Sequence, residues 1–427
     1  MHCFCAYKHN KTRISISMLR RPGSGTRSSI AQPALLGKLN AYQVLRVLQP
    51  GQELSRAEIA RSSGISAPTV SRAVESLLQA GLLEEMDARE AVPGRPARKL
   101  RLARISAQVV GVVIDAEECT VSVAGLDGRA TSETVIRFAT PPDYDELISD
   151  CVAAVGRCTS ASNITTLGVG ISVPGLIDAR NNMSILSPNV PQTNGHSPAA
   201  DIGALLPYPC VMIHETQGLC LAESRYGAAR GRDDFALLDI STGIGLSVMD
   251  GGRILSGHSG LAGEIGHITV DLHGRQCGCG NKGCLETVAS DTAMARQVGA
   301  KLNCHVTIEQ VLAMARSGEY WPEEELSGLL DYLAIGVAAI VNLFNPGAIF
   351  IYGRLFELSD RVFQDLIERV RQRTLPPSFA DCDIVRAQAN KLQAAHAGII
   401  EHLVDSVAPS FSAMSSSGTT KDRKPHH

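Results

Sequence analysis

The chain has 427 residues, twelve of them cysteine, and a formal net charge of −3 at pH 7. This length predicts two or three domains with substantial cores and excludes a small scaffold held together by disulfides. The cysteines outside one cluster are scattered, and the N-terminal segment has no apolar core typical of a signal peptide. The longest apolar stretch, residues 333–344, is too short to cross a bilayer. We therefore expect a cytoplasmic protein without membrane insertion.

Charge is distributed unevenly along the chain. Residues 1–105 contain 17 lysines and arginines against seven aspartates and glutamates, whereas the remainder contains 23 against 36. A basic N-terminal part joined to an acidic body predicts that the first part contacts nucleic acid and the second does not.

Composition divides the chain into four segments. Residues 1–36 are polar and basic, and residues 408–427 are rich in Ser, Thr, Lys and His, so we expect a disordered lead and a disordered tail. Between them we expect a small helical domain at residues 37–104 and a larger α/β domain at residues 105–407.

The small domain begins with a helical pattern. The stretch Ser55-Arg56-Ala57-Glu58 has the spacing of a capping box, which predicts a helix to about Ser63 and a turn at Gly64. Ser66 is the expected cap of the next helix, because apolar residues follow it at helical spacing. These apolar residues are Val70, Val74, Leu77 and Leu78.

Two strand candidates, residues 82–84 and 98–102, flank a Pro-Gly-Arg-Pro turn at residues 93–96. Two helices joined by a glycine turn and followed by a basic hairpin describe a winged helix-turn-helix. Its second helix enters the major groove, while the hairpin contacts phosphates or the minor groove. A module for protein contacts can have the same shape, but the basic charge favours double-stranded DNA. The expected DNA-binding residues are Ser66, Thr69, Ser71, Arg72 and Arg95.

The larger domain alternates apolar strands with helical stretches, which predicts an α/β architecture. Two strand hairpins, near residues 109–124 and 235–255, indicate two related lobes. The strands are expected at residues 109–114, 120–124, 166–173, 210–214, 235–239 and 348–351.

Residues 263–286 carry the densest chemical signal. Cys277, Cys279 and Cys284 fall within eight positions, and His267 lies ten residues before the first of them. One imidazole nitrogen and three thiolates form the tetrahedral ligand set that Zn²⁺ prefers in structural sites. Cysteine is also a common small buried residue, but a histidine at this spacing favours structural zinc.

Together, these motifs resemble the ROK family, which comprises bacterial sugar kinases and related repressors. The resemblance covers roughly residues 38–405. It implies a two-lobed actin-like, ribonuclease-H-like ATPase fold behind the winged helix-turn-helix, and a homodimer or homotetramer. The motifs that carry it are Gly170-Ile-Ser-Val-Pro174-Gly175, Ser187-Pro188-Asn189, Thr242-Gly243-Ile244-Gly245, Gly263-Glu264-Ile-Gly-His267 and the cysteine cluster that ends at Glu286.

Two departures from the kinase pattern imply that the chain is not an enzyme. The kinases carry Asp-x-Gly-Gly-Thr where this chain has Asp115-Ala116-Glu117-Glu118-Cys119. Two added carboxylates, and no glycine to admit a phosphate, should abolish ATP binding. The Asn-Asp pair that holds the kinases' catalytic base is replaced by His214-Glu215. The extra methylene of Glu215 moves its carboxylate away from the position that proton transfer needs.

The residues that match the family's sugar pocket are better preserved. Carboxylates suit a polyol because each accepts two hydroxyl hydrogen bonds. The resemblance also implies that His267 binds zinc through one ring nitrogen and directs the other towards the sugar. The expected sugar-binding residues are Asn189, His214, Glu215, Glu264, His267 and Glu286.

The main interpretation is a sugar-responsive DNA-binding transcriptional regulator, a repressor of sugar uptake or catabolism genes whose kinase-like body acts as a sensor. Two alternatives stay open. The chain could be an active ATP-dependent kinase of a hexose or N-acetylhexosamine that carries a DNA-binding head. It could also be an interaction protein that a sugar-transport protein removes from DNA.

Overall fold

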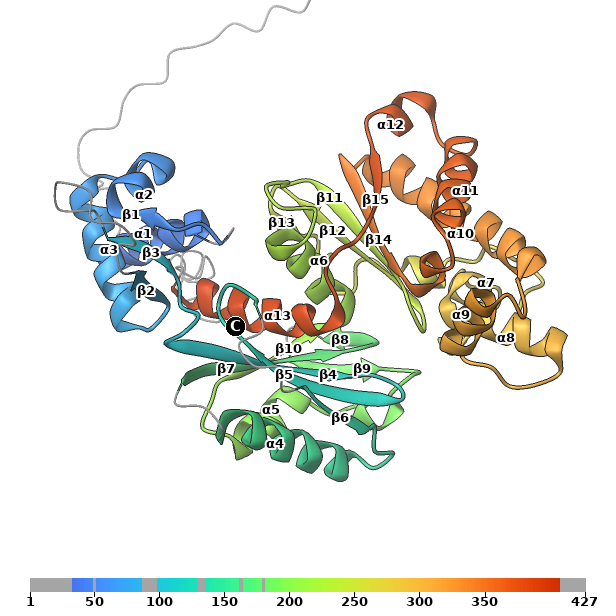
Figure 1. Cartoon of the computed structure of the whole chain (residues 1–427), viewed down its shortest axis with the longest axis horizontal. Coiled ribbons are helices and arrows are strands. Elements are labelled where there is room, and N and C mark those ends of the chain that lie inside the picture. Colours follow the sequence, from blue (N-terminus) through green and yellow to red (C-terminus); the bar gives the residue numbers. More distant parts are fainter. Residues whose placement is uncertain are drawn as a thin grey trace, which may run out of the picture.

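The computed structural model describes residues 33–48, 51–86, 98–129, 135–160, 164–178 and 181–407. These residues form an N-terminal head and two lobes, with the head against one end of the first lobe (Figure 1). The head contains helices α1 (Pro33–Leu48), α2 (Arg56–Ser63) and α3 (Ala67–Gln79) and strands β1 (Leu54–Ser55), β2 (Leu83–Met86) and β3 (Lys99–Leu102). Its strands form an antiparallel sheet in the order β1-β3-β2.

The helix-turn-helix forms where the capping pattern predicts it. The Ser55 hydroxyl accepts the Glu58 N–H at 3.3 Å, and the Glu58 carboxylate accepts the Ser55 N–H at 2.8 Å. Gly64 ends α2 with a φ of 70°, a conformation that glycine adopts without strain. Ser66 precedes α3 as expected, but its hydroxyl pairs with the Thr69 hydroxyl at 2.9 Å and does not cap a backbone N–H.

The start of the head differs from the sequence expectation. Helix α1 begins at Pro33, inside the segment expected to be a disordered lead. Proline suits the first turn of a helix, because its missing N–H would have no partner there. Residues 1–32 and 408–427, which hold the rest of the expected lead and tail, lie outside the described residues.

The first lobe is built on a five-stranded sheet in the order β10-β7-β4-β5-β6. Helices α4 and α5 cover one face, and α6 and α13 lie on the other (Figure 1). The strands are β4 (Ala107–Ile114), β5 (Glu118–Ala124), β6 (Ile136–Ala139), β7 (Thr165–Val173) and β10 (Cys210–His214), with a separate hairpin of β8 (Leu176–Asp178) and β9 (Met183–Leu186). The helices are α4 (Tyr144–Ser160), η1 (Pro191–Thr193), α5 (Pro198–Leu205), α6 (Glu215–Tyr226) and α13 (Lys391–Val407).

The second lobe has its own five-stranded sheet, in the order β13-β12-β11-β14-β15. Its strands are β11 (Phe235–Ile240), β12 (Ile244–Asp250), β13 (Arg253–Ile254), β14 (Ala348–Gly353) and β15 (Asp383–Arg386). Its helices are η2 (Ile265–His267), α7 (Glu286–Ala289), α8 (Asp291–Leu302), α9 (Ile308–Ser317), α10 (Glu323–Phe344), η3 (Arg354–Glu357), α11 (Asp360–Arg371) and α12 (Pro376–Ala380).

The two sheets have the same topology. In lobe one, β4 pairs antiparallel with β5 and parallel with β7, and β6 and β10 lie at the edges. In lobe two, β11 pairs antiparallel with β12 and parallel with β14, and β13 and β15 lie at the edges. The repeated strand hairpins in the sequence therefore mark two related lobes, as expected.

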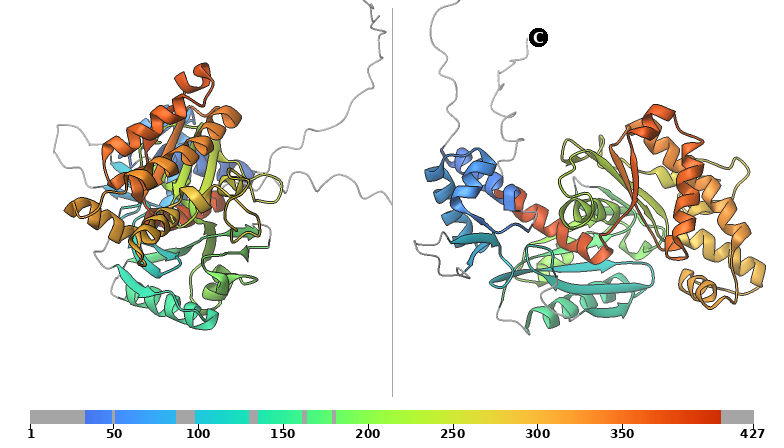
Figure 2. Two further views of the ribbon diagram at one scale, coloured as in Figure 1. Left: turned by 90° about the vertical axis from the view of Figure 1, so that its right-hand side faces the viewer. Right: turned by 45° about the horizontal axis from the view of Figure 1, so that its top comes forward.

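Helix α13 joins all three parts of the molecule. It follows the last strand of lobe two, packs on β4 and β7 of lobe one, and reaches the head (Figure 2). Ile399, Ile400 and Val404 on this helix share one buried cluster with Val44 and Leu45 of α1. The head and the body therefore do not have separate hydrophobic cores.

Glu84 of the head binds the chain segment that connects the head to the body. Its carboxylate accepts the backbone N–H groups of Arg104, Ile105 and Ser106, each at 3.1 Å. Burial opposes its ionisation, but these hydrogen bonds and one from Arg101 lower the pKa of Glu84 to about 2.

Within the described residues, α10 is the one helix long and apolar enough to cross a membrane. Leu333, Val337 and Ile340 of this helix are fully buried in the core of lobe two. Such burial is typical of a core helix.

Candidate functional site

Helix α3 presents one polar face to solvent. Ser66, Ser71 and Arg72 are exposed and Thr69 is half-buried, while the opposite face packs into the head. Four of the five residues expected to contact DNA thus lie together on or next to the second helix of the helix-turn-helix. The fifth, Arg95, lies outside the described residues.

Two arginines at the base of the wing form ion pairs within the head. Arg98 donates to Glu85 at 2.6 Å, and Arg101 donates to Glu84 at 2.7 Å. Lys99, between them, is exposed. The basic charge that favours DNA in the sequence is therefore partly neutralised at two positions by neighbouring strand β2.

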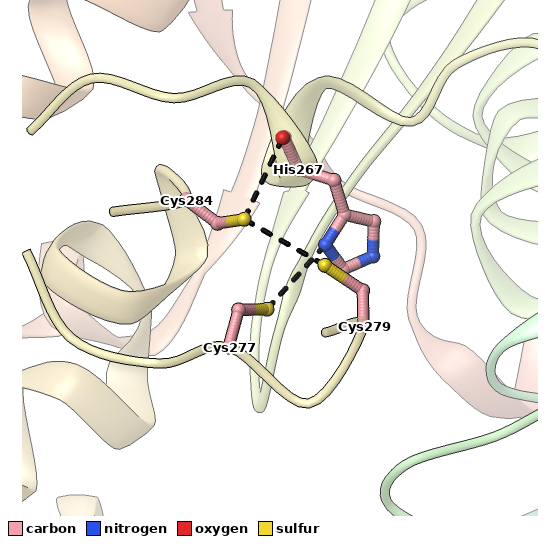
Figure 3. Close-up of side chains that lie close together, drawn as sticks. All are labelled: His267, Cys277, Cys279 and Cys284. Atoms are coloured by element: carbon pink, nitrogen blue, oxygen red, sulfur yellow. Dashed lines mark hydrogen bonds between the residues drawn. The ribbon is translucent and has the colours of Figure 1, made fainter. Parts of the chain in front are cut away.

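The four expected metal ligands meet in one cluster (Figure 3). The ligand atoms of His267, Cys277, Cys279 and Cys284 all lie within 4.8 Å of one another. The Cys279 and Cys284 sulfurs are 3.7 Å apart, and the Cys277 sulfur lies 3.6 Å from His267 Nδ1. A tetrahedral zinc with Zn–S bonds of about 2.3 Å places its sulfurs about 3.8 Å apart. The donor set and its spacing therefore fit a tetrahedral metal ion.

Burial disfavours the thiolate form of two cysteines in this cluster. Burial raises the pKa of both Cys277 and Cys284 above the usual thiol value. Coordination to a divalent metal reverses this effect, because the cation stabilises the thiolate directly.

His267 connects the cysteine cluster to two carboxylates. Its Nδ1 faces the cysteines and lies 3.5 Å from Glu286 Oε1, while its Nε2 lies 3.7 Å from Glu264 Oε2. Burial raises the pKa of Glu264, and the neighbouring His214 and His267 oppose that rise. His214, Glu264, His267 and Glu286, four of the six residues expected to bind a sugar, are therefore neighbours.

The other two expected sugar ligands are Asn189 and Glu215. Asn189 is exposed. It follows Pro188, which touches the cysteine loop closely enough that a Cβ added at Gly278 would lie 3.0 Å from it. Glu215 faces another way, since its Oε2 lies 3.2 Å from the Lys391 ammonium.

A cavity of about 1000 Å³ lies between the two lobes. Asp115, Glu117 and Glu118 line it on the lobe-one side, and Ser241 and Thr242 line it on the lobe-two side. The carboxylates that replace the kinase glycines therefore face the interlobe cavity, where the sequence comparison expects them. Neither Glu264 nor Glu286 lines it.

Sequence reasoning missed Lys391, which also lines this cavity. Its ammonium lies 2.7 Å from Asp115 Oδ2 as well as 3.2 Å from Glu215 Oε2. No local pattern indicates this role, because Asp115 is 276 residues away in the sequence.

Comparison with known proteins gives the same two-part division. A model described as the MarR family matches residues 38–92, and a model described as the ROK family matches residues 109–400. The chain is 26% identical over 387 residues to the xylose repressor of Bacillus spizizenii, a match that covers 88% of this chain and 99% of the relative. It is also 26% identical over 378 residues to the DNA-binding transcriptional dual regulator NagC of Escherichia coli K12, covering 85% and 92%.

Solved structures support the fold. A ROK family transcriptional regulator, described as a homolog of the E. coli MLC protein, matches with a TM-score of 0.75 at 24% identity, covering 87% of this chain and 98% of its own. The ROK hexokinase of Thermus thermophilus matches with a TM-score of 0.58 at 26% identity, covering 69% and 99%. The expected fold, a two-lobed kinase-like body behind a winged helix-turn-helix, is confirmed. The chain belongs to the ROK family.

Proposed function

We propose that this protein is a cytoplasmic, sugar-responsive, DNA-binding transcriptional repressor. One observation carries the proposal. A winged head shares a hydrophobic core with a body that has two carboxylates, Glu264 and Glu286, beside the cysteine loop and further carboxylates along the interlobe cavity. The xylose repressor and NagC, which match nearly over their full lengths, are named as transcriptional regulators.

In this proposal, α3 enters the major groove of an operator. Ser66, Thr69, Ser71 and Arg72 supply hydroxyl and guanidinium donors to base edges and phosphates, and Arg95 extends the contact from the wing. Two copies of the chain would place two such helices on the half-sites of a palindromic operator, so we propose a homodimer or homotetramer.

The sugar would bind next to the cysteine loop. Glu264 and Glu286 would accept hydroxyl hydrogen bonds, and His214, His267 and Asn189 would complete the pocket. Glu215 would contribute only if its carboxylate exchanged its present partner, Lys391, for the ligand.

The cation at His267, Cys277, Cys279 and Cys284 is proposed to be Zn²⁺. When bound, it supplies a structural tetrahedral link between η2 and the cysteine loop. His267 would then hold its other ring nitrogen towards Glu264, so that loop geometry and ligand pocket depend on each other.

A kinase reaction is disfavoured by the phosphate side of the cavity. The turn after β4 carries Asp115, Glu117 and Glu118 and no glycine, so a triphosphate would meet carboxylates in place of backbone N–H donors. Glu215, at the position of the kinases' base, is already paired with an ammonium.

The test is an operator-binding assay with and without sugars. DNA duplexes would be selected from a random pool with the full chain, and the affinity for the best duplex measured by fluorescence anisotropy. We expect one member of a panel that includes xylose, N-acetylglucosamine and glucose to weaken binding at least tenfold. Specific binding that no sugar changes would contradict the sensor function, and a chain that selects no duplex would contradict DNA binding.

A substitution on α3 tests the DNA-binding surface separately. Arg72→Ala should weaken operator binding by about tenfold or more, since one good base or phosphate contact contributes about 1–3 kcal/mol. The matched control is Gln79→Ala, which changes an exposed residue at the far end of the same helix. Equal affinities for the two variants would show that Arg72 is a solvent-facing residue without contact to DNA.

A further inference from the structure

Lys391 occupies a cluster of acidic side chains between the two lobes. The residue begins α13 directly after the last strand of lobe two, and its side chain is 18% exposed. Its ammonium lies 2.7 Å from Asp115, which follows β4, and 3.2 Å from Glu215, which begins α6. The lysine therefore reaches two carboxylates of lobe one from a chain segment that enters from lobe two.

A third carboxylate acts on the same ammonium. Asp239 lies on β11 of lobe two, is buried, and accepts a hydrogen bond from the Ser241 hydroxyl at 2.5 Å. Burial alone would lower the pKa of Lys391, but the charges of Glu215, Asp239 and Asp115 raise that pKa well above its usual value. The neighbouring carboxylates therefore favour the charged form of this lysine.

The cluster would be unstable without a cation. Three carboxylates that are close together and shielded from water repel one another, and removal of the central charge leaves that repulsion uncompensated. Carboxylate oxygens that converge in this way are also the ligands that hard divalent cations prefer. Kinases use divalent cations to hold the phosphates of their nucleotide.

We propose that the Lys391 ammonium is the built-in counter-ion of this cluster, in the position where Asp115, Glu215 and Asp239 would otherwise gather a divalent cation. The seated ammonium excludes a metal–nucleotide complex from the phosphate side of the cavity. It also ties α13 to both lobes at the end of the helix opposite to the head. This inference is independent of which sugar the protein senses.

A surface lysine of the same chemistry provides a matched control. Lys301 lies 2.7 Å from Glu324 and 3.2 Å from Glu325, which are nearly the distances found at Lys391. Its side chain is 45% exposed and that of Glu324 is 86% exposed, although Glu325 is buried, so water solvates Glu324 when the lysine is removed. The two sites therefore differ in burial and in the number of converging carboxylates.

The experiment measures whether loss of Lys391 creates a divalent cation site. The melting temperature of the full-length, zinc-loaded protein would be followed with and without about 5 mM Mn²⁺, a cation that prefers oxygen ligands to thiolates. We expect Lys391→Met to gain about 3 °C or more from Mn²⁺. The wild type, Lys301→Met and the double variant Lys391→Met with Asp115→Asn should gain nothing.

Each other outcome overturns the proposal. These outcomes are a folded Lys391→Met without a Mn²⁺ response, an equal response in Lys301→Met, and an undiminished response in the double variant. If Lys391→Met does not fold, the double variant still decides, because removing Asp115's charge should restore folding. A double variant as unfolded as the single one would show that Lys391 has a packing role only.

Discussion

The two regions beside the interlobe cavity differ in how their carboxylates are used. On the phosphate side, Asp115 and Glu215 hold the ammonium of Lys391. On the cysteine-loop side, Glu264 and Glu286 face His267, and their side chains remain 36% and 21% exposed. A carboxylate that is neutralised by an internal cation has little capacity left for a ligand, whereas a partly exposed one can exchange water for hydroxyl groups. The proposed loss of phosphate chemistry and the proposed retention of sugar recognition therefore rest on separate residues.

The largest effect is expected from disruption of the cysteine cluster. Cys284 is fully buried, so Cys284→Ala should lose the bound metal and lower the melting temperature by about 5 °C or more. The sugar response should fall with it, because His267 and Glu286 lose their support. Metal content by mass spectrometry and thermal unfolding measure both effects. Cys304→Ala, at an exposed cysteine outside the cluster, is the control, and equal stabilities would contradict a structural metal.

A smaller effect, confined to the ligand, is expected at Glu264. Glu264→Gln keeps the shape of the side chain but removes its charge, so the sugar concentration that releases DNA should rise about tenfold, which corresponds to about 1.4 kcal/mol. Operator affinity without sugar should not change. Glu117→Gln makes the same change on the phosphate side and should leave the sugar response intact. If the two variants behave alike, the two sides are not functionally separate.

A pH-dependent loss of stability is expected from Asp239 on the phosphate side. Burial, and after it the charge of Glu215, raise the pKa of Asp239 to about 7, although Lys391 opposes the rise. A carboxyl whose pKa is higher in the folded state gives stability that is complete below its unfolded pKa and is lost as pH rises through about 7. Between about pH 5 and pH 8, the melting temperature of the wild type should thus fall more steeply than that of Asp239→Asn. Parallel curves would contradict this, and Asp365→Asn, at an exposed site, controls for general charge effects.

The smallest effect is expected when the two glutamates that replace the kinase glycines are changed to glycine. Replacing Glu117 and Glu118 by glycine restores a flexible turn after β4, but Lys391 and its partners remain. We expect ATP binding to stay undetectable by isothermal titration calorimetry, with an unchanged melting temperature. Micromolar ATP binding by this variant would show that the turn alone, and not the ammonium, excludes the nucleotide.

Much of the fold follows from local patterns. The capping box at Ser55, the glycine at residue 64 and the apolar strand runs correctly predicted the head helices and the central strands of both lobes. The cysteine spacing also predicted a cluster whose ligand atoms do converge. These features can be predicted from the sequence because hydrogen bonds and chelation within about twenty residues depend on sequence spacing alone.

Other features required the tertiary structure. Arg98 and Arg101 contribute to the basic charge that favours DNA in the sequence, yet both pair with carboxylates on the adjacent strand. Helix α1 starts earlier than expected, and its buried face is completed by Ile399 and Ile400 from the far end of the chain. Strand pairing and helix packing bring such partners together, and no spacing in the sequence records them.

The sequence by itself determined the family, the winged head, the candidate metal ligands and the carboxylates that replace the phosphate-binding glycines, because each depends on a short run of residues. Only the tertiary structure decided which cation neutralises the neighbouring carboxylates of Asp115 and Glu215. Lys391 meets Asp115 across 276 positions of sequence, and its charge is held between the lobes because two sheets and one helix converge there. The free energy of a buried charge depends on everything that surrounds it, and that surrounding is a property of the folded chain.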